Sequence, residues 1–104
     1  MTFDEYEEKA HRTANKELRG VDALTTAVLG LAAEAGEVCS LIQKWQEAKQ
    51  PLIADQVVSE LGDVLWYIQE TLHRLSPLVG RRHTLADTAI INLEKTEQRH
   101  KDRL

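Results

Sequence analysis

Residues 30–45 read GLAAEAGEVCSLIQKW, a small and apolar run that is interrupted by two carboxylates, Glu34 and Glu37. At about 100° per residue of a helix, Glu34 falls inside the apolar arc and Glu37 lies at its edge. An ionised acid in apolar surroundings is costly unless it is paired or bound to a metal. The apolar positions recur at intervals of three and four and predict one long helix: Leu24, Val28, Leu31, Val38, Ile42 and Trp45.

A second acidic pair repeats this arrangement in residues 59–68, SELGDVLWYI, where Glu60 and Asp63 share a helix face with Tyr67. If the two helices pack antiparallel, the four carboxylates converge and repel one another unless a cation is present. Oxygen ligands without a neighbouring His or Cys favour a hard ion, Mg²⁺ first and Mn²⁺ second. Either pair alone would also be typical of a solvated helix face. A helix-weakening glycine beside an acid in both segments, Gly36 and Gly62, indicates that something needs the space there.

The rest of the chain predicts an all-α fold, a four-helix bundle-like domain over residues 1–104 that is completed by homo-oligomerisation. The first helix begins at Thr2, with a capping box to Glu5, and ends before Gly20. The second begins at an Asp22 N-cap and ends near EAKQP at 47–51. The third has Pro51 in its first turn and stops at SPLVG, residues 76–80. The fourth is capped by Thr84, and its tail at 99–104 frays.

Composition excludes several classes of protein. Seventeen acids against thirteen Lys and Arg give a net charge of −4, and the basic residues form no block, so nucleic acid is not an expected partner. The single Cys39 cannot form an intramolecular disulfide, which fits a reducing compartment. No apolar run approaches the roughly 20 residues of a membrane span. We expect a soluble cytoplasmic protein.

The segments GLAAEAGEV (30–38) and ELGDVLWYI (60–68) resemble the paired acidic signature of the MazG-like family of all-α nucleoside triphosphate pyrophosphohydrolases. The resemblance extends to HRTAN at 11–15 and NLEKTEQR at 92–99, with Thr96 departing from the usual Leu. It implies a compact single-domain member that cleaves (deoxy)nucleoside triphosphates to monophosphate and pyrophosphate, in nucleotide-pool housecleaning. It implies that the catalytic Mg²⁺ ligands are Glu34, Glu37, Glu60 and Asp63.

Five further residues are candidates for substrate binding. Lys44 lies two turns after Glu37 on the same helix face, within reach of a β or γ phosphate, although a solvated lysine would look the same. Tyr67 could stack on a base or fill the core. The family resemblance makes substrate contacts of three residues that align on one face of the last helix, where a solvated face is the alternative: Asn92, Lys95 and Arg99.

Three other functions fit parts of the sequence. Two Glu-x-x-His pairs, Glu70 with His73 and Glu97 with His100, are the spacing of a ferritin-like di-iron site. A non-enzymatic helical interaction module is the second alternative, and a phosphoribosyl-ATP pyrophosphohydrolase is the third. Because Trp66 points away from the main apolar stripe and the central helices are broadly apolar, we expect a homodimer or a dimer-of-dimers tetramer with the active site near the interface.

Overall fold

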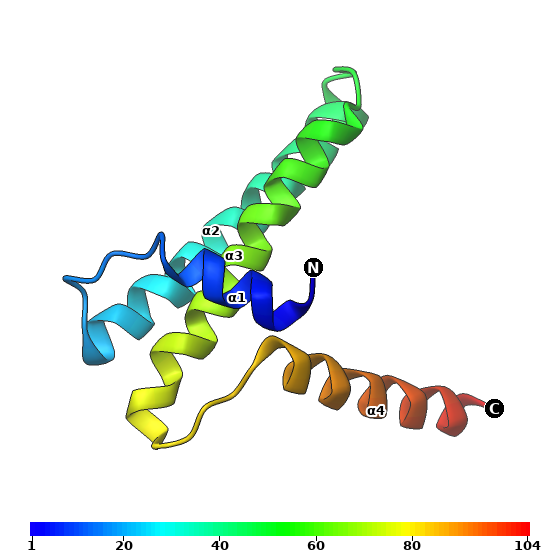
Figure 1. Cartoon of the computed structure of the whole chain (residues 1–104). Helices are drawn as coiled ribbons and strands as arrows, with labels where there is room; N and C mark the ends of the chain where they lie inside the picture. Colours follow the sequence, from blue (N-terminus) through cyan, green and yellow to red (C-terminus); the bar gives the residue numbers. More distant parts are fainter.

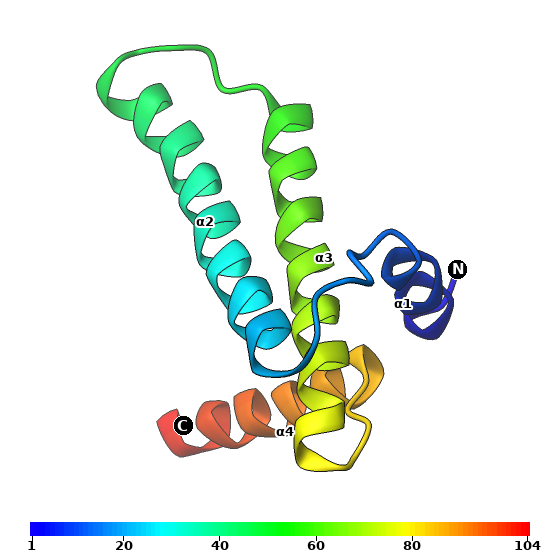
Figure 2. The same ribbon diagram turned by 90° about the vertical axis from the view of Figure 1, so that its left-hand side faces the viewer.

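The computed structural model describes all 104 residues and contains four α-helices and no strands, so the all-α prediction is confirmed (Figure 1). The helices are α1 (Phe3–His11), α2 (Gly20–Glu47), α3 (Ala54–Val79) and α4 (Leu85–Arg103). Helices α2 and α3 form a long antiparallel hairpin, α1 packs across α3, and α4 starts at the foot of the hairpin (Figure 2).

The α2–α3 hairpin forms because each helix carries one apolar stripe that the other covers. The two helices pack against each other, and each carries half-buried apolar side chains: Leu31, Val38 and Ile42 on α2, and Val64 and Ile68 on α3. The turn at residues 48–53 is closed by two amides, those of Ala48 and Gln50, which both donate to the carbonyl of Lys44 at 3.1 Å. This antiparallel pairing is the condition under which the two acidic pairs meet.

Helix α1 begins as predicted, at the Thr2 capping box. The Thr2 hydroxyl accepts from the Glu5 amide at 3.1 Å, and the Glu5 carboxylate accepts from the Thr2 amide at 3.4 Å. The helix ends at His11, well before Gly20, and residues 12–19 form a loop. Trp66 anchors α1 to α3, because its indole N–H donates to the Ala10 carbonyl (3.3 Å) and the Thr13 hydroxyl (2.9 Å). Trp66 is therefore committed to α1 and does not support the predicted dimer.

Helix boundaries differ from the expected ones by a few residues. Helix α2 starts at Gly20, whose φ of 60° favours glycine, rather than after Asp22. Helix α3 starts at Ala54, and Pro51 lies in the preceding loop. At its other end α3 runs through Pro77 and stops at Gly80, which has a φ of 73° and donates its amide to the Ser76 carbonyl. Proline is thus tolerated in the last turn, and glycine ends the helix.

Helix α4 begins as predicted, with the Thr84 hydroxyl accepting from the Asp87 amide at 3.0 Å. It stays helical to Arg103, so the fraying expected for the tail is not seen. The helix contacts α1 and α3 only, and Figure 1 shows it leaving the hairpin at a wide angle. A single chain therefore does not close a four-helix bundle, because cap residues fix where α4 starts and not the direction that it takes, and completion of the bundle by a second copy stays a prediction.

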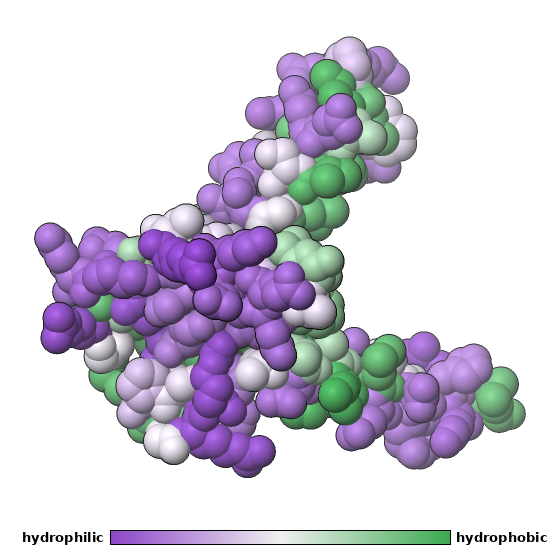
Figure 3. All heavy atoms as spheres, in the orientation of Figure 1, coloured by the Kyte–Doolittle hydropathy of each residue, from purple (hydrophilic) through white to green (hydrophobic).

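A single chain leaves much of its apolar surface exposed. Only 8 of 104 residues are buried, and the accessible surface is 7698 Å², against about 5,900 Å² for a compact monomer of this mass. Green hydrophobic atoms gather at the upper end of the hairpin and along α4 (Figure 3). Large apolar residues at these two places include Trp45, Leu52, Ile53, Val58 and Leu61, and Ile90, Ile91 and Leu93. A single copy therefore leaves these apolar side chains in contact with solvent.

Helix α2 also qualifies as a membrane span by length and composition alone, contrary to the expectation that no segment does. An 18-residue window reaches a mean hydropathy of 1.3, and 6% of that window is buried. Every 18-residue window of this helix contains both Glu34 and Glu37. Carboxylates at the centre of a span are expensive in lipid, so this likeness is weak support for a membrane helix.

Candidate metal centre

Three of the four predicted carboxylates come together on the inner face of the hairpin. Glu34 from α2 and Glu60 and Asp63 from α3 place one oxygen each within 4.8 Å of one another. Glu34 and Glu60 are half-buried, and Asp63 is exposed. Glu37 is exposed and lies outside this group, although its charge acts on Glu34. We call Glu34, Glu60 and Asp63 the carboxylate cluster.

The carboxylate cluster contains no cation of its own. None of the ion pairs formed by Arg or His in the structure involves these three acids. Partial burial, the charge of Asp63 and a hydrogen bond with Glu60 raise the pKa of Glu34. A group of oxygen donors whose proximity disfavours ionisation fits a hard divalent cation, which would relieve the repulsion.

Tyr6 brings α1 near this cluster, which the sequence did not indicate. Burial and the charge of Asp63 raise the pKa of the Tyr6 hydroxyl. A tyrosine in the first helix has no periodic relation to an acid in the third. Only the packing of α1 across α3 brings the two together.

Tyr67 lies one turn after Asp63 and faces α2. With Trp66 it lines a pocket of about 150 Å³ between α2, α3 and the loop at 12–19. Lys44 lies in the opposite direction along the hairpin. It lines an open cavity of about 550 Å³ that also includes Glu60 and Ser59. The carboxylate cluster therefore has an aromatic pocket on one side and an open, polar cavity with a lysine on the other.

The structure does not bring the last helix to the cluster. Asn92, Lys95 and Arg99 are exposed on the stretch of α4 that projects away from the body of the chain. Because α4 makes no contact with α2, these residues cannot reach Glu34 within one chain. The prediction that they join the site is not met by a single copy.

A second polar cluster lies where α1, α3 and the start of α4 meet, and sequence reasoning missed it. Glu70 is buried and accepts from His11 at 3.0 Å and from Arg74 at 2.6 Å. Glu7 is also buried and accepts from Arg82 and from the Leu85 amide at the start of α4. We call these residues the paired network: Glu7, His11, Glu70, His73, Arg74 and Arg82.

The paired network satisfies its own charges. Burial opposes ionisation of Glu70, but hydrogen bonds from His11 and Arg74 outweigh it and lower the pKa of this carboxyl. Burial, together with the charges of Arg82 and His11, lowers the pKa of His73. Its Nδ1 donates to the Gln69 carbonyl at 2.9 Å, which leaves Nε2 to accept from Arg82 at 3.2 Å. His73 is thus held as a neutral imidazole.

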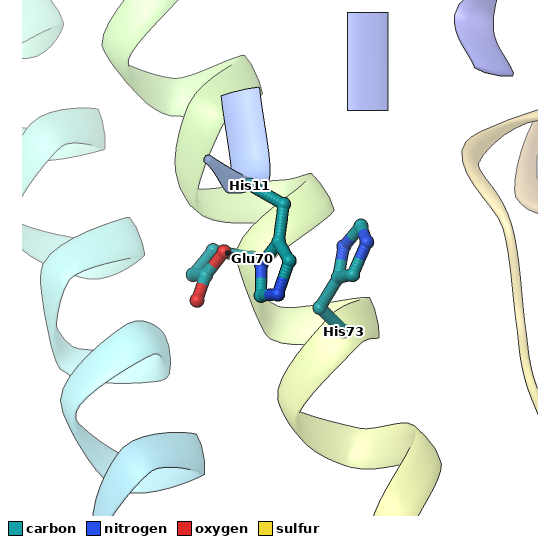
Figure 4. A group of neighbouring side chains, drawn as sticks. All are labelled: His11, Glu70 and His73. Carbon is teal, nitrogen blue, oxygen red and sulfur yellow. Dashed lines mark hydrogen bonds and ion pairs between the residues drawn. The ribbon is translucent and has the colours of Figure 1, made fainter. Parts of the chain in front are cut away.

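Donor atoms of His11, Glu70 and His73 also lie within 4.8 Å of one another (Figure 4). The two imidazoles are stacked, however, with centroids 4.1 Å apart and planes inclined by 9°. Nitrogen lone pairs lie in the ring planes, so two parallel rings cannot both point at one ion, and both nitrogens of His73 are engaged. The other Glu-x-x-His pair, Glu97 and His100, is exposed on α4. The structure therefore assembles no di-iron site.

Comparisons with known proteins agree with the paired acidic helices. Residues 23–104 match the family described as the MazG nucleotide pyrophosphohydrolase domain. Over 59 aligned residues the chain is 32% identical to the Gene 37 protein of Mycobacterium phage L5. The aligned region covers 53% of this chain and 52% of that protein. The chain thus spans about half the length of this curated relative, and no solved structure matches. Since the match includes both acidic helices and most of the sequence, the chain belongs to the MazG nucleotide pyrophosphohydrolase family.

Proposed function

We propose that this protein hydrolyses nucleoside triphosphates to monophosphate and pyrophosphate with Mg²⁺, or Mn²⁺ in its place, as a housecleaning enzyme of the nucleotide pool. The observation that carries the proposal is the carboxylate cluster. Three acids from two antiparallel helices meet without an ion pair to any base of the chain. The family to which the chain belongs supports this reaction class for the cluster.

In this proposal Glu34, Glu60 and Asp63 hold the metal, and the exposed Glu37 lies at the open edge, where it could hold a second ion. When bound, the metal neutralises phosphate charge and favours ionisation of an attacking water. Water oxygen bonds to the α phosphorus, the bond from that phosphorus to the α–β bridging oxygen breaks, and pyrophosphate leaves. One of the four carboxylates, or another Glu outside the metal's ligands, orients the water and accepts its proton.

The two neighbouring cavities suggest how the nucleotide lies. The aromatic side chains of Tyr67 and Trp66 offer a base a stacking surface. Lys44, at the other end, offers a cation to the β and γ phosphates. The substrate would then run along the hairpin, with its base toward α1 and its terminal phosphates toward the turn at 48–53.

Product analysis tests this proposal. Ribo- and deoxynucleoside triphosphates incubated with Mg²⁺ are expected to yield pyrophosphate and monophosphate, and the reaction is expected to stop when EDTA is added. Release of orthophosphate with a nucleoside diphosphate would contradict the α–β cleavage. No turnover of any nucleotide would favour the helical interaction module.

The same proposal includes a homodimer, or a dimer of dimers, with no nucleic acid or membrane partner. The exposed apolar residues of the hairpin and of α4 support it, since a second copy would cover them. A second copy also offers Asn92, Lys95 and Arg99 a carboxylate cluster that their own chain does not. A monomeric mass in sedimentation at micromolar concentration would contradict it.

Mixing two inactive variants tests whether copies share sites. If Lys95 of one copy serves the cluster of another, Asp63→Asn and Lys95→Ala chains that exchange subunits regain about a quarter of the parent activity. If each chain completes its own site, mixing restores no activity.

Fractionation of cells tests the proposed cytoplasmic location, because a chain held in lipid by α2 would resist extraction at alkaline pH.

A further inference from the structure

One glycine lies in a contact that no other residue could make. An ideal Cβ built on Gly30 would be 2.1 Å from Cε1 and 2.5 Å from Cζ of the Tyr67 ring. The same atom built on Gly36 or Gly62 meets nothing within 4 Å. The expectation that Gly36 and Gly62 make space is therefore wrong within one chain. The glycine that makes space is Gly30.

The contact between Gly30 and Tyr67 lies directly beside the carboxylate cluster. Gly30 is one helical turn before Glu34 on α2, and Tyr67 is one turn after Asp63 on α3. Because the helices are antiparallel, these two steps lead to the same level of the hairpin. The distance between α2 and α3 at this contact thus affects how close Glu34 comes to Asp63.

A neighbouring ring restricts how Tyr67 can move aside. Its ring meets the Trp66 ring edge to face, with centroids 4.9 Å apart. Trp66 is itself fixed by its hydrogen bonds to Ala10 and Thr13 of the N-terminal segment. A methyl group on residue 30 would therefore push α2 away from α3 or force the Tyr67 ring out of its place in the pocket wall.

From these contacts we infer that Gly30 is a positioning residue, which lets the Tyr67 ring lie between the helices and so sets the spacing that assembles the metal site. The inference rests on the proposed function. Carbon atoms pack at about 3.5–4.0 Å, so an alanine needs a shift of more than 1 Å. Metal sites tolerate about 0.2 Å in a ligand distance. The shift is too large for the site to absorb without loss of affinity.

The inference is tested by measuring how tightly the full chain binds Mn²⁺. The electron paramagnetic resonance signal of the free ion reports how much Mn²⁺ stays unbound. Gly30→Ala is expected to weaken Mn²⁺ binding about tenfold, the effect typical of losing a group that orients a ligand. Gly36→Ala and Gly62→Ala are matched controls on the same two helices and are expected to bind as the parent does. Equal binding by the parent and Gly30→Ala would overturn the inference. Absence of binding by the parent itself would instead overturn the proposed metal site.

Thermal melts in EDTA test the contact without metal. Gly30→Ala is expected to melt below the parent, whereas the two controls melt at or above it because alanine favours a helix interior. A Gly30→Ala that melts with the controls would show that the ring yields freely and would overturn the inference.

A second variant keeps the test decisive if Gly30→Ala does not fold. In a Tyr67→Ala background the ring is gone, so adding Gly30→Ala is expected to leave folding and Mn²⁺ affinity unchanged. A further tenfold loss in that background would show that the ring is not the cause and would overturn the inference.

Discussion

Helix α3 contributes acids to two clusters that are treated in opposite ways: Glu60 and Asp63 to the carboxylate cluster, and Glu70, about two to three turns further along, to the paired network. Glu70, in the paired network, receives hydrogen bonds from His11 and Arg74, and its pKa is lowered. The carboxylate cluster forms no ion pair with a base, and the pKa of Glu34 is raised. A carboxylate with a cation supplied by the chain is a structural group. A carboxylate that the chain leaves among other acids awaits a cation from outside.

Removing an acid of the carboxylate cluster gives the largest expected effect. Asp63→Asn should lower Mg²⁺-dependent hydrolysis by about a thousandfold, since a catalytic metal contributes several kcal/mol of charge stabilisation. Glu47→Gln, an exposed acid of α2, is the control and should keep the parent rate. Steady-state pyrophosphate release measures both. An Asp63→Asn enzyme with near-parent turnover would contradict a catalytic role for the carboxylate cluster.

Removing an acid of the paired network should damage the fold. Glu70→Gln leaves Arg74 without a charge partner in a largely buried site and should cost about 3 kcal/mol of unfolding free energy. Glu8→Gln breaks an exposed pair with Arg12 and should cost less than about 1 kcal/mol. Urea denaturation in EDTA compares them. Equal stability of the two variants would remove the distinction between a paired acid and a surface acid.

Glu34→Gln should behave in the opposite way to Glu70→Gln. In EDTA we expect it to be at least as stable as the parent, because it removes a charge that repels Glu60 and Asp63. Millimolar Mg²⁺ should add about 1–3 kcal/mol to the parent alone, for a ten- to hundredfold excess over the Kd. Thermal melts with and without Mg²⁺ decide. A metal-free Glu34→Gln that melts well below the parent means that Glu34 is structural.

The smallest effect is on the dependence of stability on pH. His73 has a lowered pKa in the folded chain, where Arg82 and His11 oppose its charge and Glu7 favours it. The stability that His73 contributes to the folded chain is complete above pH 6.5, the ordinary pKa of histidine. It is lost as the pH falls through the lowered pKa of the folded chain. Glu34 acts in the opposite direction. The stability that it contributes is present below pH 4.5, the ordinary pKa of its carboxyl group, and is lost as the pH rises through the raised pKa of the folded chain. The melting temperature of metal-free His73→Gln should therefore fall less steeply than that of the parent as the pH drops below 6.5.

What the sequence could predict follows from the range of each interaction. Glu60 and Asp63 are three residues apart, and helical period alone places them on one face, so the acidic faces were predictable. The bond from His11 to Glu70 joins residues 59 apart, and no local pattern contains it. Helical period places Glu70 on the side of α3 opposite Leu61. The face that meets α1 was not visible from periodicity.

Glu7 also affects the direction in which α4 projects, because it binds the residues at the start of that helix. Its carboxylate, on a helix that precedes the matched residues 23–104, holds both Arg82 and the first amide of α4. From that fulcrum α4 extends for 19 residues, or about 28 Å at 1.5 Å per residue. A rotation of only 10° at Glu7 would swing the far end of the helix by about 5 Å. The short helix α1 can in this way set the direction of α4. Relatives with a different α1 would present the same α4 surface at a different angle.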